Sequence, residues 1–376
     1  MRGPFPGRGR MTSTCKRLFE VVAKSREPVD SVVIINGLDK FTDHTFFYLT
    51  GYEHGTMEGS VCVAFPDGRV EVITSPLEES SARRGAAKVH VCSDPKEREQ
   101  IFGEMLSSSA KVGYNGSELV LSSFRWLERA AKTKTLVDVG ESIRLARVVK
   151  NEDEIAKIKG ACDIASRAFE EVLPRIKVGM KEYEVAAELN YLMLRHGAQG
   201  PSFTTISAFG ANAAEPHYTS GSAVLAEGSL MVLDFGALYR RYCSDITRTI
   251  AIKKPKKELQ RMYDLVRESQ QLSMDSMRDG VDAKHPDAVA RDFLDKSEFK
   301  GRFIHSLGHS LGLAVHDGYG MSTRADFKLE TGMVMTVEPG LYVPELGGVR
   351  IEDDVVVTEK GIRVLTTASR DLAVVG

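Results

Sequence analysis

The chain carries two aspartates at the ends of neighbouring strand-like segments. The apolar run Leu230–Leu233 ends at Asp234, and Asp245 opens the alternating segment that follows. A hairpin with a loop centred on Tyr239-Arg240 places the two aspartates opposite each other, with Cβ atoms about 4.5–5.5 Å apart. Carboxylates this close repel each other, so the pair needs a shared proton or a cation between them. Two unrelated exposed aspartates at strand ends are the alternative interpretation.

A second stretch repeats this arrangement with glutamates. The run Met333–Val337 reads as a buried strand that ends at Glu338. A turn centred on Glu345 brings Glu338 opposite Glu352, which precedes the next strand. The two pairs together predict a cage of four carboxylates, whose charge two divalent cations would neutralise. Such hard oxygen ligands suit Mn²⁺ or similar ions, which lie about 3.5–4 Å apart in two-metal sites.

Three of the nine histidines lie in one segment, residues 303–317 (FIHSLGHSLGLAVHD). We expect His309 to supply the one nitrogen ligand of the cage, and His305 and His316 to face the substrate. For each of these histidines alone, a structural role is the alternative. The glycines of the segment allow close approach of the backbone, and they are Gly308 and Gly312.

The pattern along the chain predicts two domains. Residues 13–145 alternate short strands and helices, as in an α/β domain, and contain no catalytic constellation. Residues 146–376 combine helices with antiparallel hairpins, which indicates an α+β catalytic domain. The main expected elements are strands at 31–36, 60–66 and 70–74, with a hairpin turn at 67–68, and helices at 151–173, 181–195, 258–278 and 285–296.

The N-terminal residues differ in composition from the rest of the chain. Residues 1–12 begin with a Gly/Pro/Arg-rich run (MRGPFPGRGR) and are expected to form a disordered tail. A start-site artefact, with Met11 as the true start, and a small nucleic-acid-binding arm are the alternatives. No apolar h-region follows the basic run, so it does not read as a signal peptide.

Composition narrows the classes of function. The 376 residues are 42% hydrophobic and 27% charged, and the net charge is −2, so nucleic acid is not an expected partner. No uncharged apolar run reaches the roughly 20 residues of a membrane helix. The five cysteines are scattered without a CxxC pair, which favours a reducing cytoplasm over a disulfide framework.

The chemistry-bearing segments resemble those of the pita-bread metallopeptidases, specifically the prolidase and aminopeptidase P branch. The resemblance covers residues 150–376 closely, and residues before them resemble the smaller N-terminal domain of this branch more loosely. It implies an α+β pita-bread catalytic domain. The matching stretches follow the family's order and spacing: NAAEPHY (212–218), LDFGALYRRYCSDITRT (233–249), FIHSLGHSLGLAVHD (303–317), TVEPGLYVP (336–344) and GGVRIEDDVVVTEKG (347–361).

The resemblance implies a role for each metal ligand. Asp234 corresponds to the carboxylate that chelates one metal, and Asp245 and Glu352 correspond to the bridging pair. His309 and Glu338 correspond to the ligands of the other metal. The five residues accept Mn²⁺, which we expect first, and also Co²⁺ or Zn²⁺.

The resemblance also implies the catalytic residues of a peptidase that cuts between an N-terminal residue and proline. His217, His305 and His316 match histidines that hold the substrate and the tetrahedral intermediate. Glu338 is implied to shuttle the proton to the leaving nitrogen, and Arg350 matches an arginine beside the last ligand. The implied nucleophile is a hydroxide that bridges the two metals.

Substrate length stays open between a dipeptidase and an aminopeptidase. Dipeptide-specific relatives are expected to clamp the product carboxylate with an arginine that would fall at Gly320 here, and Arg324 is a possible substitute. The glycine, together with Asp317 after His316, favours the open site of an aminopeptidase P. Glu215 is another departure that could contact the substrate.

Two alternative functions remain open. The fold also occurs in binding modules that have lost metal ligands, whereas this chain retains all five. An aminopeptidase of the same fold with non-proline specificity is the other alternative. The resemblance further implies a homodimer.

Overall fold

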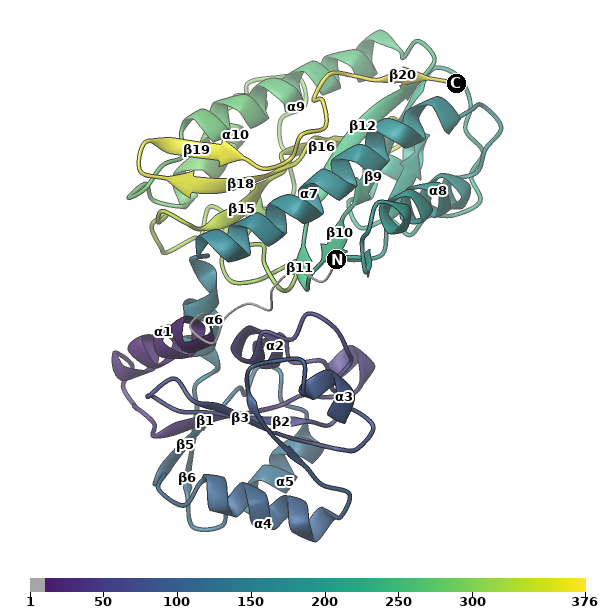
Figure 1. The fold of residues 1–376 in the computed structure, drawn as a ribbon. Coiled ribbons are helices and arrows are strands. Elements are labelled where there is room, and N and C mark those ends of the chain that lie inside the picture. The colour runs from purple at the N-terminus through teal and green to yellow at the C-terminus, as the bar shows by residue number, and fades with distance from the viewer. Residues whose placement is uncertain (1–10) are drawn as a thin grey trace. The chain divides into compact units, whose positions relative to one another are not determined.

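The computed structural model describes residues 11–376 of the chain. The predicted tail lies outside this part except for its last two residues, which begin helix α1 (Met11–Ala23). The chain divides into two compact units, the first reaching to Arg147 and the second running from Val148 to Gly376 (Figure 1).

The N-terminal unit is built on a six-stranded mixed sheet with the order β4-β3-β2-β1-β5-β6. The hairpin predicted at Asp67-Gly68 is confirmed, since β2 and β3 pair antiparallel across it. Helices α4 and α5 cover one face of the sheet, where Phe102 and Leu127 are fully buried (Figure 1). The strands are β1 (Ser31–Ile35), β2 (Val61–Ala64), β3 (Val70–Thr74), β4 (Lys88–Val91), β5 (Lys111–Tyr114) and β6 (Thr135–Asp138). The remaining elements are η1 (Asp39–Phe41), α2 (His44–Thr50), α3 (Glu79–Ala82), α4 (Pro95–Met105), α5 (Leu121–Ala131) and α6 (Gly140–Val148).

Helices of the second unit begin and end close to the predicted positions. Asn151 is the N-cap of α7, and its side chain accepts from the backbone of Glu154, which bonds back in a capping box. The apolar stripe of this helix is buried and includes Ile158 and Phe169. The four helices are α7 (Glu152–Val172), α8 (Glu182–Arg195), α9 (Lys257–Asp275) and α10 (Lys284–Leu294), with short η2 (Leu173–Arg175) and η3 (Gly210–Ala214).

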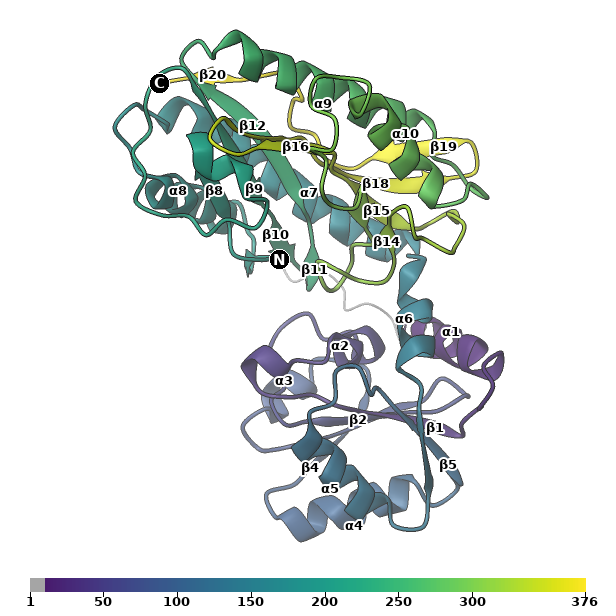
Figure 2. The same ribbon diagram turned by 180° about the vertical axis from the view of Figure 1, so that it is seen from behind.

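Strands of the second unit lie between two helical layers, which gives the predicted α+β architecture. Helices α7 and α8 pack on β9 and β12, while α9 and α10 pack on the strands of the C-terminal half (Figures 1 and 2). The longer strands are β8 (Ile206–Phe209), β9 (Ser229–Phe235), β12 (Ile246–Ile252), β15 (Val334–Val337), β16 (Gly340–Val343), β17 (Gly347–Arg350), β18 (Asp353–Thr358) and β19 (Gly361–Val364). The short ones are β7 (Gly200–Pro201), β10 (Ala237–Tyr239), β11 (Tyr242–Cys243), β13 (Gly308–His309), β14 (Gly320–Met321) and β20 (Val374–Val375).

The register of the first hairpin differs from the prediction. Asp234 pairs with Thr247 rather than with Asp245, so the predicted register was wrong by two residues. The turn consists of Arg240 and Arg241, with φ of 48° and 73°. A two-residue hairpin turn of this kind is usually marked by Asn or Gly, which tolerate positive φ. Arginines carry no such signal, and because the shift is even, both aspartates keep their face of the sheet.

The register of the second hairpin is confirmed. Strands β16 and β17 pair around Glu345, which has φ of 68°, and β15 and β18 continue the same register. Glu338 and Glu352 lie between these two paired segments, and the shared register places them opposite each other.

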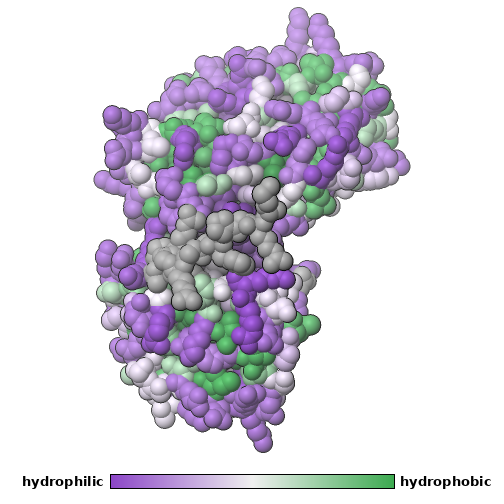
Figure 3. Space-filling model, in the orientation of Figure 1, coloured by the Kyte–Doolittle hydropathy of each residue, from purple (hydrophilic) through white to green (hydrophobic). Residues whose placement is uncertain are grey.

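None of the helices among residues 11–376 combines the length and the apolar character that crossing a bilayer requires. Figure 3 shows hydrophilic side chains over most of the visible face, with hydrophobic ones in small patches.

Candidate metal centre

The two hairpins bring their acidic residues to one cluster with His309. The Nε2 atom of His309 lies 3.6 Å from Asp245 Oδ2 and 3.5 Å from Glu338 Oε1. Ligand atoms of Asp245, His309 and Glu352 all lie within 4.8 Å of one another. Asp234 joins through Arg350, whose Nη2 donates to its Oδ2 at 2.6 Å.

The donor atoms of this cluster suit a cation. Asp245 and Glu352 are 5% and 2% exposed, yet Asp245 Oδ1 and Glu352 Oε1 have no hydrogen-bond partner, and neither has Asp234 Oδ1. Buried carboxylate oxygens without a donor are costly, because nothing replaces the water they lose. Three orphaned oxygens beside one imidazole fit hard divalent ions, which take oxygen and nitrogen ligands.

Electrostatics of the cluster lead to the same conclusion. Burial, reinforced by neighbouring carboxylates, raises the pKa of Asp245 and of Glu352 well above the ordinary range. Burial also raises the pKa of Glu338 to about 8, against the opposing effect of Arg350. Burial and the adjacent His316 lower the pKa of His309 to about 3, which keeps its imidazole neutral, as a metal ligand must be. The acidic residues therefore need protons or cations to share this space.

Two threonines orient the carboxylates. The hydroxyl of Thr247, which stands opposite Asp234, donates to Glu352 Oε2 at 2.7 Å. The hydroxyl of Thr336 donates to Glu338 Oε1 at 3.2 Å and accepts from the backbone N–H of His309 at 3.0 Å. Hydrogen bonds of this kind fix the direction in which a ligand presents its lone pairs.

Arg350 links both hairpins to a tyrosine that the sequence analysis did not single out. Its Nε donates to Thr247 Oγ1 at 2.9 Å, and its Nη1 donates to Tyr342 Oη, also at 2.9 Å. Tyr342 Oη lies 2.8 Å from His305 Nε2. Strand spacing did not reveal Tyr342, because the strand is interrupted at Glu338-Pro339 between β15 and β16.

The remaining predicted histidines gather near this centre. The ring centroids of His309 and His316 are 4.1 Å apart. Burial and the Arg350 guanidinium lower the pKa of His305 to about 4, and burial together with His217 lowers the pKa of His316. His217 and His316 are exposed, as groups that meet a substrate would be.

The close backbone approach that the sequence analysis expected at Gly308 is present. A Cβ there would lie 2.0 Å from the main-chain oxygen of Thr336, so any side chain would push β13 away from β15. His309 follows this glycine directly. The glycine therefore lets His309 stand beside Glu338.

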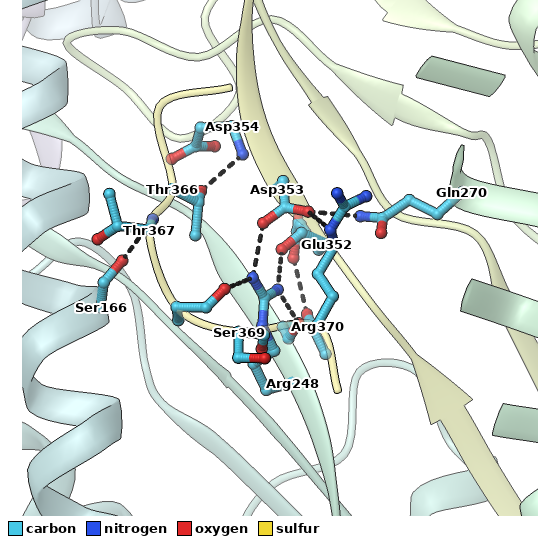
Figure 4. A network of polar contacts seen from close by, with 12 residues as sticks. Ser166, Arg248, Gln270, Glu352, Asp353, Asp354, Thr366, Thr367, Ser369 and Arg370 are labelled. Atoms are coloured by element: carbon cyan, nitrogen blue, oxygen red, sulfur yellow. Dashed lines mark hydrogen bonds and ion pairs between the residues drawn. The ribbon is translucent and has the colours of Figure 1, made fainter. Parts of the chain in front are cut away.

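A buried polar network fixes the backbone behind Glu352 (Figure 4). Arg248, 1% exposed, donates to the main-chain oxygen of Glu352 at 2.5 Å and to Asp353 Oδ1 at 2.6 Å. Its Nε also donates to the main-chain oxygen of Ser369, and Gln270 donates to Asp353 Oδ2 at 3.0 Å. The sequence analysis missed this network, although an arginine inside a fully buried strand signals one.

Asp354 fixes the backbone of Asp245 in a similar way. Its Oδ2 accepts from the backbone N–H of Asp245 at 3.0 Å and from Cys162 Sγ at 3.2 Å. Burial raises the pKa of Asp354 to about 7. Nothing in the sequence marked this carboxylate, because its partners lie far away along the chain.

Comparison with known proteins places these features in a family. Residues 156–359 match the model of metallopeptidase family M24, and residues 22–149 match the creatinase/prolidase N-terminal domain. The chain belongs to metallopeptidase family M24. The predicted resemblance, the pita-bread fold with its smaller N-terminal domain, and the assignment as a hydrolase are thereby confirmed.

Individual relatives cover most of the chain. An Xaa-Pro dipeptidase from Pyrococcus furiosus is 38% identical over 277 residues, which is 74% of this chain and 79% of the relative. The crystal structure of an X-Pro aminopeptidase from Thermotoga maritima matches with a TM-score of 0.87 and 33% identity, covering 92% of this chain and 98% of that one. The prolidase from Pyrococcus horikoshii matches with a TM-score of 0.85 and 33% identity, covering 96% and 99%.

Proposed function

We propose that this M24 hydrolase is a dinuclear-metal-dependent Xaa-Pro peptidase, which cleaves the bond between an N-terminal residue and proline. The observation that carries the proposal is the set of orphaned buried carboxylate oxygens beside His309. The Xaa-Pro dipeptidase and X-Pro aminopeptidase among the relatives support the choice of substrate.

Two divalent cations are proposed to bind between the hairpins. Asp234 would hold one and His309 the other, with Asp245 and Glu352 shared and Glu338 beside His309. Mn²⁺ is the first candidate, and Co²⁺ or Zn²⁺ satisfy the same ligands. When bound, such cations lower the pKa of a water molecule enough to make it a nucleophile near neutral pH.

The side chains of the centre would manage protons and charge during cleavage. Glu338 would take a proton from the attacking water and pass it to the leaving nitrogen, as the family resemblance implies. His217 and His316 would donate to the oxygen that gains charge at the scissile carbonyl. Arg350 and His305, joined through Tyr342, would hold Asp234 and the substrate in place. The nitrogen of proline has no N–H to recognise, so the site must bind the ring itself.

We further propose that the site accepts peptides longer than dipeptides. Gly320 pairs directly with His309, and a Cβ built on it meets only the main-chain oxygen of Gly308, 3.8 Å away. The edge of the centre beside His309 is therefore free of a side chain at that position. Arg324, the possible substitute clamp, is exposed.

A product assay tests both proposals. Protein loaded with Mn²⁺ or Co²⁺ is given an Xaa-Pro dipeptide, an Xaa-Pro-Yaa-Yaa tetrapeptide and a matched Xaa-Ala-Yaa-Yaa tetrapeptide. The proposals predict cleavage of the Xaa-Pro tetrapeptide and not of the alanine control. A Gly320→Arg variant should lose the tetrapeptide in favour of the dipeptide. Cleavage of the dipeptide alone by the wild type would restrict it to a dipeptidase, and equal cleavage of the alanine control would indicate non-proline specificity.

Assembly and location are also proposals. The family resemblance supports a homodimer, and the free state of all five cysteines supports a reducing cytoplasm. The boundary between the two compact units, which follows Arg147 in the sequence, supports a division into domains 13–145 and 146–376. A catalytically inactive binding module is the rival function, and intact ligands without bound metal or turnover would favour it.

A further inference from the structure

A buried glutamate outside the metal centre carries an unusual number of hydrogen bonds. Glu182, the first residue of α8, has 0% of its surface exposed. Its Oε1 accepts from the backbone N–H of Phe209 at 2.7 Å and from Asn212 Nδ2 at 3.0 Å. Its Oε2 accepts from Tyr218 Oη at 2.9 Å and from the backbone N–H of Gly221 at 3.0 Å.

All four donors come from one segment, residues 209–221. A buried carboxylate is tolerated where hydrogen bonds replace its lost hydration. Here that replacement comes from the segment, so the carboxylate and the segment fix each other. The donors lie before and after His217, and Asn212 also donates to Tyr218 Oη at 2.8 Å.

The other side of the same segment rests on the hairpin that carries Arg350. A Cβ on Gly348 would lie 1.9 Å from the main-chain oxygen of Ala213, so the segment packs directly on the β17 backbone. The main-chain oxygen of Pro216 accepts from Arg350 Nη1 at 3.4 Å. His217 follows Pro216 and is close enough to His305 to contribute to the lowered pKa of that imidazole.

We propose that Glu182 is a positioning residue, which holds segment 209–221 so that His217 faces the metal centre. The proposal rests on the proposed peptidase function. In this proposal Glu182 contacts neither the substrate nor a metal ligand. Glu182 acts through His217. Its effect should therefore appear in turnover of the substrate and leave metal binding intact.

The central variant is Glu182→Gln, which keeps the shape of the side chain. In either orientation the amide NH₂ meets two donors of the segment and can accept from neither. Glu184→Gln is the matched control, because Glu184 lies in the same helical turn, is exposed and accepts from the backbone N–H of Lys181, a bond that glutamine can keep. We expect kcat/KM of the metal-loaded enzyme on an Xaa-Pro peptide to fall at least about tenfold in Glu182→Gln, with metal content unchanged, and to stay within about twofold in the control.

A double-mutant cycle with His217→Ala separates positioning from general stability. If Glu182 acts through His217, Glu182→Gln should cost less than about threefold in the His217→Ala background, since coupled residues are not additive. Fully additive losses would overturn the proposal. So would a fall in metal content that accounts for the loss of activity.

Chymotrypsin cleavage after Tyr218 gives a readout that does not depend on peptidase activity. Under native conditions the cleavage rate should rise at least about tenfold in Glu182→Gln and not in Glu184→Gln. Unchanged cleavage would overturn the proposal, whereas faster cleavage in a protein without Xaa-Pro activity would refute only the proposed function. If Glu182→Gln does not fold, Tyr218→Phe, which removes one donor, must show the same changes at a smaller scale, and its failure to do so would equally overturn the proposal.

Discussion

The two acidic hairpins reach the same result through different turns. In the first, the turn residues Arg240 and Arg241 both have positive φ, and Asp234 faces Thr247. In the second, the loop is centred on Glu345, and the glutamates face each other as their spacing predicts. Spacing alone therefore identified both acidic pairs but fixed only one register. Turn chemistry decides the register, and it is visible in sequence only where the turn residues are typical.

The difference has a chemical consequence at the centre. Because Asp245 is displaced along its strand, Thr247 occupies the place opposite Asp234 and can donate to Glu352 of the other hairpin. The second hairpin has an internal counterpart in Thr336, which donates to its own Glu338. Thr247 thus joins the two hairpins, whereas Thr336 joins Glu338 of its own hairpin to the backbone of His309.

The largest expected effect comes from removing one charged ligand from either hairpin. Asp245→Asn and Glu352→Gln should each lower kcat/KM by at least about a thousandfold, because several kcal/mol of charge stabilisation by the metals are lost. The metal-free variants should melt at a higher temperature than the metal-free wild type, since a neutral amide avoids the cost of burying an ionisable carboxyl among other carboxylates. Kinetics, metal content and thermal unfolding check this. Full activity in either variant would contradict a shared site.

A matched pair of threonine variants sharpens the comparison. Thr247→Val should weaken metal binding by about 10–100-fold, because it frees Glu352 from its orienting hydroxyl and removes an acceptor for Arg350. Thr336→Val should have a smaller effect, because its bond to Glu338 is longer and its other bond goes to the backbone N–H of His309 rather than to a ligand atom. Titration of the metal-free proteins with Mn²⁺ measures both. The reverse order of effects would show that the link between hairpins is unimportant.

Burial of the acidic cluster, reinforced by the charge of Asp234, should also appear as a pH dependence of the metal-free protein. The folded state raises the pKa of Glu338 from 4.5 to about 8, so it binds a proton that the unfolded state has lost, and stability falls as pH rises through this range. His309, with its pKa lowered from 6.5 to about 3, acts oppositely, but only below pH 6.5. Thermal unfolding should therefore occur at a lower temperature at pH 8 than at pH 6.5. Metal affinity should rise over the same interval. A melting temperature and a metal affinity that do not change between pH 6.5 and 8 would contradict the raised pKa of Glu338.

The smallest expected effect concerns the turn of the second hairpin. Glu345→Gly should stabilise the protein by about 0.5–1 kcal/mol, because glycine adopts positive φ without steric cost. Glu345→Val should destabilise it, since a β-branched residue is strained there. Denaturant unfolding measures both, and peptidase activity should not change. Stabilisation by valine would show that φ is not what limits this turn.

Local patterns in the sequence were sufficient for much of the fold and of the candidate centre. The helix predicted at 151–173 is marked by signals within a few residues of each other, and the acidic residues directly follow apolar strand runs. The first register failed because Arg240 and Arg241 carry no turn signal. The supporting residues were missed for another reason, since Arg248 bonds Ser369 and Glu182 bonds a separate loop far along the chain. Such contacts exist only once the fold has formed.

The metal dependence of Xaa-Pro cleavage is the decisive test of the proposed dinuclear peptidase site. The protein is stripped with a chelator and titrated with Mn²⁺, while bound metal per chain and hydrolysis of an Xaa-Pro peptide are followed together. No hydrolysis is expected without metal, and activity should rise to a plateau as two ions bind between the hairpins. Undiminished hydrolysis by the stripped protein, or two bound ions without any Xaa-Pro cleavage, would contradict this proposal.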